Sequence, residues 1–251
     1  FIGGDDLFDY HDFVVGAEDT EKHYQLLGSF LLEAQWDVLD FTSLPETSPT
    51  IKYIPDFFEK KGFNVQILEQ DVVPGMVLPK TWDDFLQSLR KKDRHELRRK
   101  IRRIEESGQY HLRSADLKTL DDDIDALLDL MRTSHAGKED FLTENRAQFF
   151  RSIVKEMAEL NYLRLQFLEI EGTPLAVVLG FDYGGIRWLY NSGYMVRSDS
   201  LSAGLVLKAL FINEAVDLGL KYFDFMKGPE AYKYRLGGKD SRLYQILIKK
   251  A

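Results

Sequence analysis

The chain has 251 residues, 44% of them hydrophobic, which is enough for a substantial core in one large or two small domains. It contains no cysteine, which excludes disulfides, thiolate metal sites and a cysteine nucleophile. No apolar run approaches the ~20 residues of a membrane helix, and there is no signal-peptide pattern, so we expect no membrane span and a cytoplasmic location. The sequence begins at Phe1 as though already inside a fold, so we expect that an upstream segment is missing.

The net charge of −8 is unevenly distributed along the chain. Residues 90–103 hold nine Lys and Arg against Asp93 and Glu96, a local charge of 9 − 2 = +7, so the remainder carries −8 − 7 = −15. A charge run of this kind is usually a solvated helix face, and contact with a polyanion is the alternative function. Because the remainder would repel a long polyanion, we expect no strong nucleic-acid binding.

The first part of the chain alternates helical and strand patterns. Apolar residues at helical spacing predict helices over 20–34 and 51–62, and alternating or β-branched runs predict strands over 36–41 and 63–68. This order is typical of an α/β lobe, and the periodicity alone permits several such folds. We therefore expect residues 1–78 to form a first, partial lobe.

A cluster of turn-forming residues follows this lobe. The segment 74–79 contains two prolines and a glycine, which favours a boundary between a first domain, 1–78, and a second domain, 79–251. Thr81 is placed to cap the next helix, whose apolar stripe continues through the basic segment.

The second domain contains the clearest strands in the sequence. A short strand over 110–114 is followed by two amphipathic helical segments. Three strand-like runs then follow, separated by short turns that contain glycine, over 162–170, 175–183 and 186–194. These runs predict an antiparallel meander. Residues 242–249 supply the last predicted strand.

The stretch from Tyr190 to Gly238 reads as strand, turn, helix, strand and loop, with the helix beginning near Ser202 or Ala203 and ending at Gly219. A helix that starts directly after a strand presents unpaired amides and the positive end of its dipole, which suits a pyrophosphate. An ordinary capped turn explains the local sequence about equally well. The residues of this turn that we predict to bind the donor are Arg197, Ser200, Ser202, Ala203 and Gly204.

The segment FDFMKGPEAYKYRLGG resembles the closing motif of the FemAB-type aminoacyltransferases and of the related GNAT acetyltransferases of cellulose and exopolysaccharide biosynthesis, the CelD-like type. The residues that match the family pattern are Asp224, Gly228, Glu230, Tyr232, Lys233, Arg235 and Gly237. Upstream, LSAGLVL resembles the family's helix start, with Ala203 in place of proline. The sequence departs from the common GNAT donor signature because Ser200 and Ser202 stand where glycines are usual.

Acyl transfer needs a bound donor, a group that stabilises developing negative charge, and a proton acceptor. Lys233, beside the loop glycines, is the best candidate for charge stabilisation. Tyr232 and Tyr234 could protonate a leaving thiolate, and packing is an equally good explanation for them. Asp224 and Glu230 are candidate bases, although a structural hydrogen bond suits Asp224 slightly better.

The resemblance implies a GNAT-like α/β (α+β) fold, with a mixed, mostly antiparallel sheet flanked by helices and a partial second GNAT-like lobe at the N-terminus. It implies an enzyme that moves an acyl group, in the first place acetyl, from acetyl-CoA to an amine or hydroxyl of a small-molecule or saccharide acceptor. No zinc-binding motif is present, so we expect no metal. Two alternatives remain open: an aminoacyl-tRNA-dependent transferase, and an inactive GNAT-like binding module.

Overall fold

The structure is a computed structural model that describes residues 7–134, 138–196 and 201–250. Its helices are η1 (Ala17–Asp19), α1 (Thr20–Glu33), α2 (Thr50–Glu59), α3 (Trp82–Ser88), α4 (Lys91–Glu106), α5 (Leu120–Ser134), α6 (Lys138–Phe141), α7 (Glu144–Glu159), α8 (Ala203–Asp217) and α9 (Ala231–Arg235). Its strands are β1 (Val38–Pro45), β2 (Asn64–Val77), β3 (Tyr110–Ser114), β4 (Leu163–Ile170), β5 (Thr173–Tyr183), β6 (Ile186–Tyr194), β7 (Tyr222–Asp224) and β8 (Lys239–Lys249).

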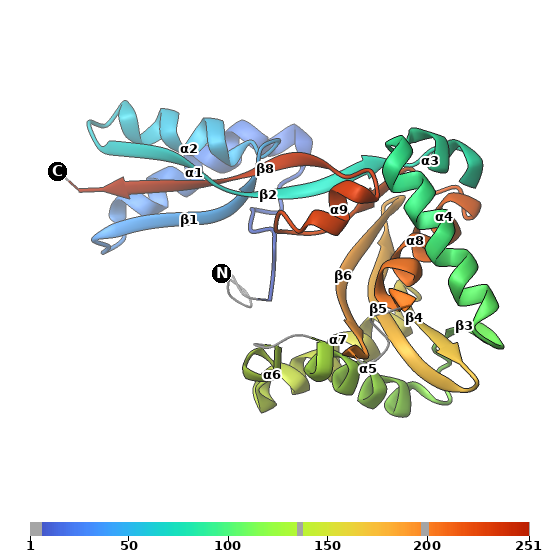
Figure 1. The fold of residues 1–251 in the computed structure, drawn as a ribbon. Helices are drawn as coiled ribbons and strands as arrows, with labels where there is room; N and C mark the ends of the chain where they lie inside the picture. The colour runs from blue at the N-terminus through green and yellow to red at the C-terminus, as the bar shows by residue number, and fades with distance from the viewer. Residues whose placement is uncertain (1–6, 135–137, 197–200, 251) are drawn as a thin grey trace. The chain divides into compact units, whose positions relative to one another are not determined.

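The strands form one mixed sheet in the order β1-β8-β2-β7-β6-β5-β4-β3 (Figure 1). Neighbours run mostly antiparallel, whereas β6 and β7 are parallel and are joined by the crossover helix α8. The predicted fold class, a mostly antiparallel mixed sheet flanked by helices, is therefore confirmed. The predicted meander is confirmed as β4, β5 and β6.

The described chain divides into two compact units. The first consists of Phe1–Pro74, Lys227–Pro229 and Lys239–Ala251. The second consists of Gly75–Met226 and Glu230–Gly238. Our expectation of a first domain over 1–78 and a second domain over 79–251 stays a prediction.

In the first unit, helices α1 and α2 share one core with strands β1 and β8. Tyr24 and Phe58 pack there against Phe41 and Ile246, all of them buried. The hydroxyl of Tyr24 is 2.7 Å from the hydroxyl of Thr50, so the buried polar group has a partner. Burial raises the pKa of Tyr24, which keeps this phenol protonated.

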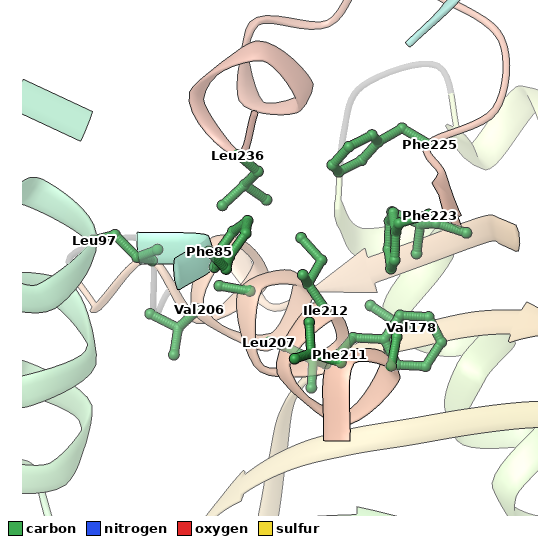
Figure 2. Packing of buried hydrophobic residues seen from close by; sticks show 14 of the residues in the cluster. Phe85, Leu97, Val178, Val206, Leu207, Phe211, Ile212, Phe223, Phe225 and Leu236 are labelled. Atoms are coloured by element: carbon green, nitrogen blue, oxygen red, sulfur yellow. The ribbon is translucent and has the colours of Figure 1, made fainter. Parts of the chain in front are cut away.

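In the second unit, the core is organised around α8. Figure 2 shows Leu97 of α4 on one side of this helix and Val178 and Phe223 of the sheet on the other, with Leu236 near a third side. Apolar residues of α8 recur at three- and four-residue spacing, which predicts one apolar stripe facing a sheet. The helix is instead buried around most of its circumference, because α3 and α4 cover the side that faces away from the strands. Helices α5 and α7 lie on the opposite face of the sheet.

Two predictions of local structure in this region were wrong. The strand predicted over 63–68 is longer than expected: β2 runs from Asn64 through Pro74 and Gly75 to Val77, and its end from Gly75 to Val77 pairs with β7. The single helix predicted after Thr81 is two helices, α3 and α4. Leu89 between them has an extended backbone, and its side chain is buried in the core of the second unit. The predicted Thr81 cap is confirmed by its hydrogen bond from the Asp84 amide.

Among the helices of the described part of the chain, none has both the length and the apolar character needed to cross a bilayer.

Candidate active site

The parallel strands β6 and β7 pair over only three residues. Their ladder joins Ile186 to Tyr222 and ends where Trp188 meets Asp224. Strand β7 stops there, whereas β6 continues to Tyr194. The chain that links the end of β6 to the start of β7 includes α8, so the first turn of α8 follows the part of β6 that extends beyond β7.

The first turn of α8 holds three of the predicted donor-binding residues. Ser202 precedes the helix in a left-handed conformation, with φ of 55°. The alternative of an ordinary capped turn predicts a capping hydrogen bond, and the Ser202 hydroxyl makes none. That hydroxyl instead accepts a hydrogen bond of 2.5 Å from Nζ of Lys100 in α4. Ala203 is buried. Arg197 and Ser200 lie outside the described residues.

An aromatic ring lies against Gly204. A Cβ at this position would be 3.2 Å from the Tyr194 ring, closer than an ordinary contact. The glycine therefore lets the end of β6 lie directly on the first turn of α8. The first backbone amides of a helix have no partner within the helix and remain available to a bound anion.

Lys208 lies one turn further along α8 and is 6% exposed. Its Nζ points back to the first turn, 3.4 Å from the carbonyl oxygen of Gly204. The same Nζ lies 4.9 Å from the ring centroid of Tyr232, in cation–π contact. Lys208 thus connects the predicted donor turn to the predicted catalytic segment.

The predicted catalytic segment is the short helix α9 rather than the expected loop. Tyr232 contacts Phe225 edge to face as well as Lys208. Burial, and to a smaller extent the charge of Glu230, raises the pKa of Tyr232. Its phenol is therefore protonated at physiological pH and is a hydrogen-bond donor, not a base.

Lys233 is almost fully buried, with 2% of its surface exposed. Its Nζ donates a hydrogen bond of 2.8 Å to the carbonyl oxygen of Met226 and lies 2.9 Å from a carboxylate oxygen of Glu230. Asp224 accepts a hydrogen bond of 2.7 Å from the amide of the same Met226, which has φ of 62°. Asp224 and Lys233 therefore bind the amide and the carbonyl of Met226, a residue in an unfavourable backbone conformation. Both side chains thus have a structural role in holding Met226.

The other two predicted catalytic residues differ in exposure. Glu230 is the residue before α9, and its side chain is 56% exposed while paired with Lys233. Tyr234 is partly buried in the same helix, and its carbonyl accepts a hydrogen bond from the amide of Gly237. The structure therefore places Tyr232 in cation–π contact with Lys208, and it pairs Lys233 with Glu230.

Two lysine ammonium groups lie near the start of α8, and that of Lys100 is also 3.5 Å from a carboxylate oxygen of Glu96. The ammonium groups of Lys100 and Lys208 approach the first turn, whose amides carry the positive end of the helix dipole. This arrangement suits an anion such as a pyrophosphate. Within the described ranges, there is no group of three or more His, Asp or Glu side chains that could hold a metal ion.

A family model described as "Acetyltransferase (GNAT) domain" matches residues 91–234, more than half of the chain. The chain belongs to this GNAT acetyltransferase family. It is therefore an acyltransferase, and the match spans both the α8 turn and Lys233. No curated protein matches the chain at a significant level of sequence similarity.

The similarity of this GNAT protein to solved structures extends over nearly the whole chain. The structure of FemX has 12% sequence identity, covers 93% of this chain and 78% of its own, and gives a TM-score of 0.65. A conserved protein of unknown function from Bacteroides thetaiotaomicron has 10% sequence identity and a TM-score of 0.66. The match covers 92% of this chain and 75% of that protein's chain. The C-terminal domain of a putative lysylphosphatidylglycerol synthetase from Agrobacterium fabrum has 10% sequence identity and a TM-score of 0.60. The match covers 92% of this chain and 73% of that domain's chain. At this identity the similarity shows a shared fold.

Sequence reasoning missed Lys100 and Lys208 as members of this site. Lys208 could have been noticed, because it is the one charged residue in the apolar run AGLVLKALFIN. A buried lysine within a core helix needs a polar partner or a ligand. Lys100 has no such signal, since it is one of many basic residues in α4.

Proposed function

We propose that this GNAT protein transfers an acyl group, in the first place acetyl, from acetyl-CoA or another acyl-CoA to an amine or hydroxyl acceptor. The observation that carries the proposal is the convergence of Lys100 and Lys208 on the first turn of α8, the helix that joins β6 to β7. In the proposal, the amides of Ala203 and Gly204 and the two ammonium groups hold the donor's pyrophosphate. Arg197 and Ser200 are proposed to extend this site.

The donor supplies a thioester, whose carbonyl carbon is attacked by the acceptor's nitrogen or oxygen as the carbon–sulfur bond breaks. We assign the exposed carboxylate of Glu230 to accept the acceptor's proton and the ammonium of Lys233 to stabilise negative charge. Tyr232, and Tyr234 beside it, would donate hydrogen bonds. The raised pKa of Tyr232 favours a stabilising hydrogen bond to the leaving sulfur over complete proton transfer. Asp224 would support the site by holding Met226.

The acceptor is proposed from the resemblance of the segment 222–238 to enzymes of cellulose and exopolysaccharide biosynthesis. It would be a saccharide or another precursor of the cell envelope. We propose a cytoplasmic location, where coenzyme A, the carrier of the proposed donor, is available.

A second candidate function is transfer of an aminoacyl group from aminoacyl-tRNA. It is favoured by the similarity to the FemX and lysylphosphatidylglycerol synthetase structures, which covers more than nine-tenths of this chain. The convergent lysines would suit a tRNA phosphate as well as a pyrophosphate. An inactive binding module would keep the fold and bind a donor without turning it over.

The test is single-turnover transfer with labelled donors over a panel of amine and sugar acceptors. We expect label from acetyl-CoA to reach at least one acceptor, and no transfer from aminoacyl-tRNA. Transfer from aminoacyl-tRNA alone would replace the proposal by the second function. Binding of coenzyme A without transfer to any acceptor would indicate a binding module.

Lys208→Met tests the donor site directly, because methionine preserves the buried stem and removes the ammonium. We expect the affinity for coenzyme A, measured by calorimetry, to fall about 10- to 100-fold, the loss expected for one charge-assisted hydrogen bond. Lys221→Met is the matched control, since Lys221 is an exposed lysine of the same unit. Equal affinities for both variants and the unmodified protein would remove Lys208 from the donor site.

A further inference from the structure

Helix α4 has two chemically different faces. Its apolar residues Leu97 and Ile104 are 2% and 1% exposed and belong to the core of the second unit. At 100° per residue, Lys91, Arg98 and Arg102 fall with His95 within about 60° of one another on the opposite face, and all four are exposed. This stripe extends about 16 Å along the helix. A second exposed row beside it consists of Lys92, Arg99 and Arg103.

Much of this basic face is not neutralised by the protein itself. Arg99 is paired with Glu96, and Arg90 at the start of the helix is paired with Asp93. For Lys91, Lys92, Arg98 and Arg102, no ion pair with another described residue is found. Since residues 90–103 carry +7 and the remainder −15, the segment has a net positive charge within an acidic chain. The expected solvated face therefore carries a large unbalanced charge, and clustered guanidinium groups are well suited to phosphate.

We propose that the exposed face of α4 binds the surface of a membrane that contains anionic phospholipids. The contact is electrostatic and reversible, because the apolar residues of α4 are committed to the core and are not available to insert into the bilayer. Binding of this kind would hold the acyltransferase at the membrane surface. It does not depend on which acyl donor the site uses.

A nucleic acid fits this face less well than a membrane does. Proteins that hold a single strand combine basic residues with aromatic side chains on which bases stack, and α4 contains no Phe, Trp or Tyr. Most duplex readers place side chains from a helix into a groove, and they add further basic contacts on both sides. The remainder of this chain is acidic overall, so it has no excess of basic residues to make such flanking contacts.

The experiment is co-sedimentation of the whole chain with phosphatidylcholine vesicles, with and without phosphatidylglycerol. We expect binding to the anionic vesicles at low salt, and loss of binding at about 0.5 M NaCl, where the Debye length is much shorter than at physiological salt. Neutral vesicles should bind little protein. For Arg98→Gln/Arg102→Gln we expect about 30-fold weaker binding to the anionic vesicles, since each basic residue near the surface adds a comparable increment.

Lys60→Gln/Lys61→Gln is the matched control, because it removes two exposed positive charges outside α4. It should bind the anionic vesicles as the unmodified protein does, and circular dichroism should show both variants folded. An equal loss for both variants would mean that net charge alone determines binding, which would overturn the proposal. Equal binding to neutral vesicles, or salt-sensitive binding of tRNA in the absence of vesicle binding, would overturn it as well.

Discussion

Replacing Arg187 by methionine is expected to lower the free energy of unfolding by about 3–5 kcal/mol, the largest effect on stability that we predict for a single substitution. Arg187 lies in β6 and is fully buried. Its guanidinium makes two hydrogen bonds of 2.7 Å to the carboxylate of Asp182 and is paired with Glu214. It also donates to the carbonyl oxygen of Phe211 at 2.9 Å and lies over the ring of that residue.

The cost arises from the partners that Arg187 leaves behind. Asp182 is 9% exposed in its side chain and would keep one basic partner, Arg164. Removal of one member of a buried ion pair leaves the other charge poorly solvated. Because Phe211 and Glu214 belong to α8, the same network fixes α8 on β6, and the substitution should also displace the donor turn.

Urea unfolding followed by circular dichroism measures the effect. Arg132→Met is the control, because the pair between Arg132 and Asp129 is an exposed contact of 3.0 Å within one helix. Its loss should change the free energy by less than about 1 kcal/mol. A loss for Arg187→Met that is no larger than for the control would show that the buried network contributes little.

Substitution of Lys233 is expected to give the largest effect on catalysis. Lys233→Ala should lower turnover about 10²- to 10³-fold, the range for removing one group that stabilises a developing negative charge. The structure adds a loss of stability of about 1–3 kcal/mol, because the carbonyl of Met226 loses a buried hydrogen-bond donor. Lys233→Arg should also lose activity, since a site with 2% exposure has little room for a planar guanidinium.

Turnover per folded molecule separates the two roles of Lys233. Asp224→Ala is the matched control, because it removes the other hydrogen bond to Met226 without removing an ammonium group. If Lys233 stabilises charge during the reaction, its variants should lose far more turnover per folded molecule than Asp224→Ala does. Equal losses would mean that Lys233 acts only by holding Met226, and the proposed catalytic role would then be abandoned.

The sequence predicted the parts of the fold that local patterns specify. Alternation of apolar residues and the pair Gly184–Gly185 defined the β5–β6 hairpin, and helical spacing with Gly219 at the end defined α8. The hairpin register also places Asp182 opposite Arg187. Their pairing could have been inferred from the sequence, but their burial beneath α8 could not.

What the sequence by itself determined was the family resemblance, the alternation of helices and strands, and the segments from which the candidate site is built. The tertiary structure decided which strands pair and what surrounds each buried charge, because both depend on contacts between residues distant in the chain. Gly75 stays in a strand because β7 pairs with it, and Lys208 contacts the predicted catalytic segment because Tyr232 folds onto it. Asp224 and Lys233 meet at Met226 only when α9 packs beside the end of β7. Local propensity carries no information about partners this distant in the chain, so the pairing of strands and the surroundings of buried charges had to come from the folded protein.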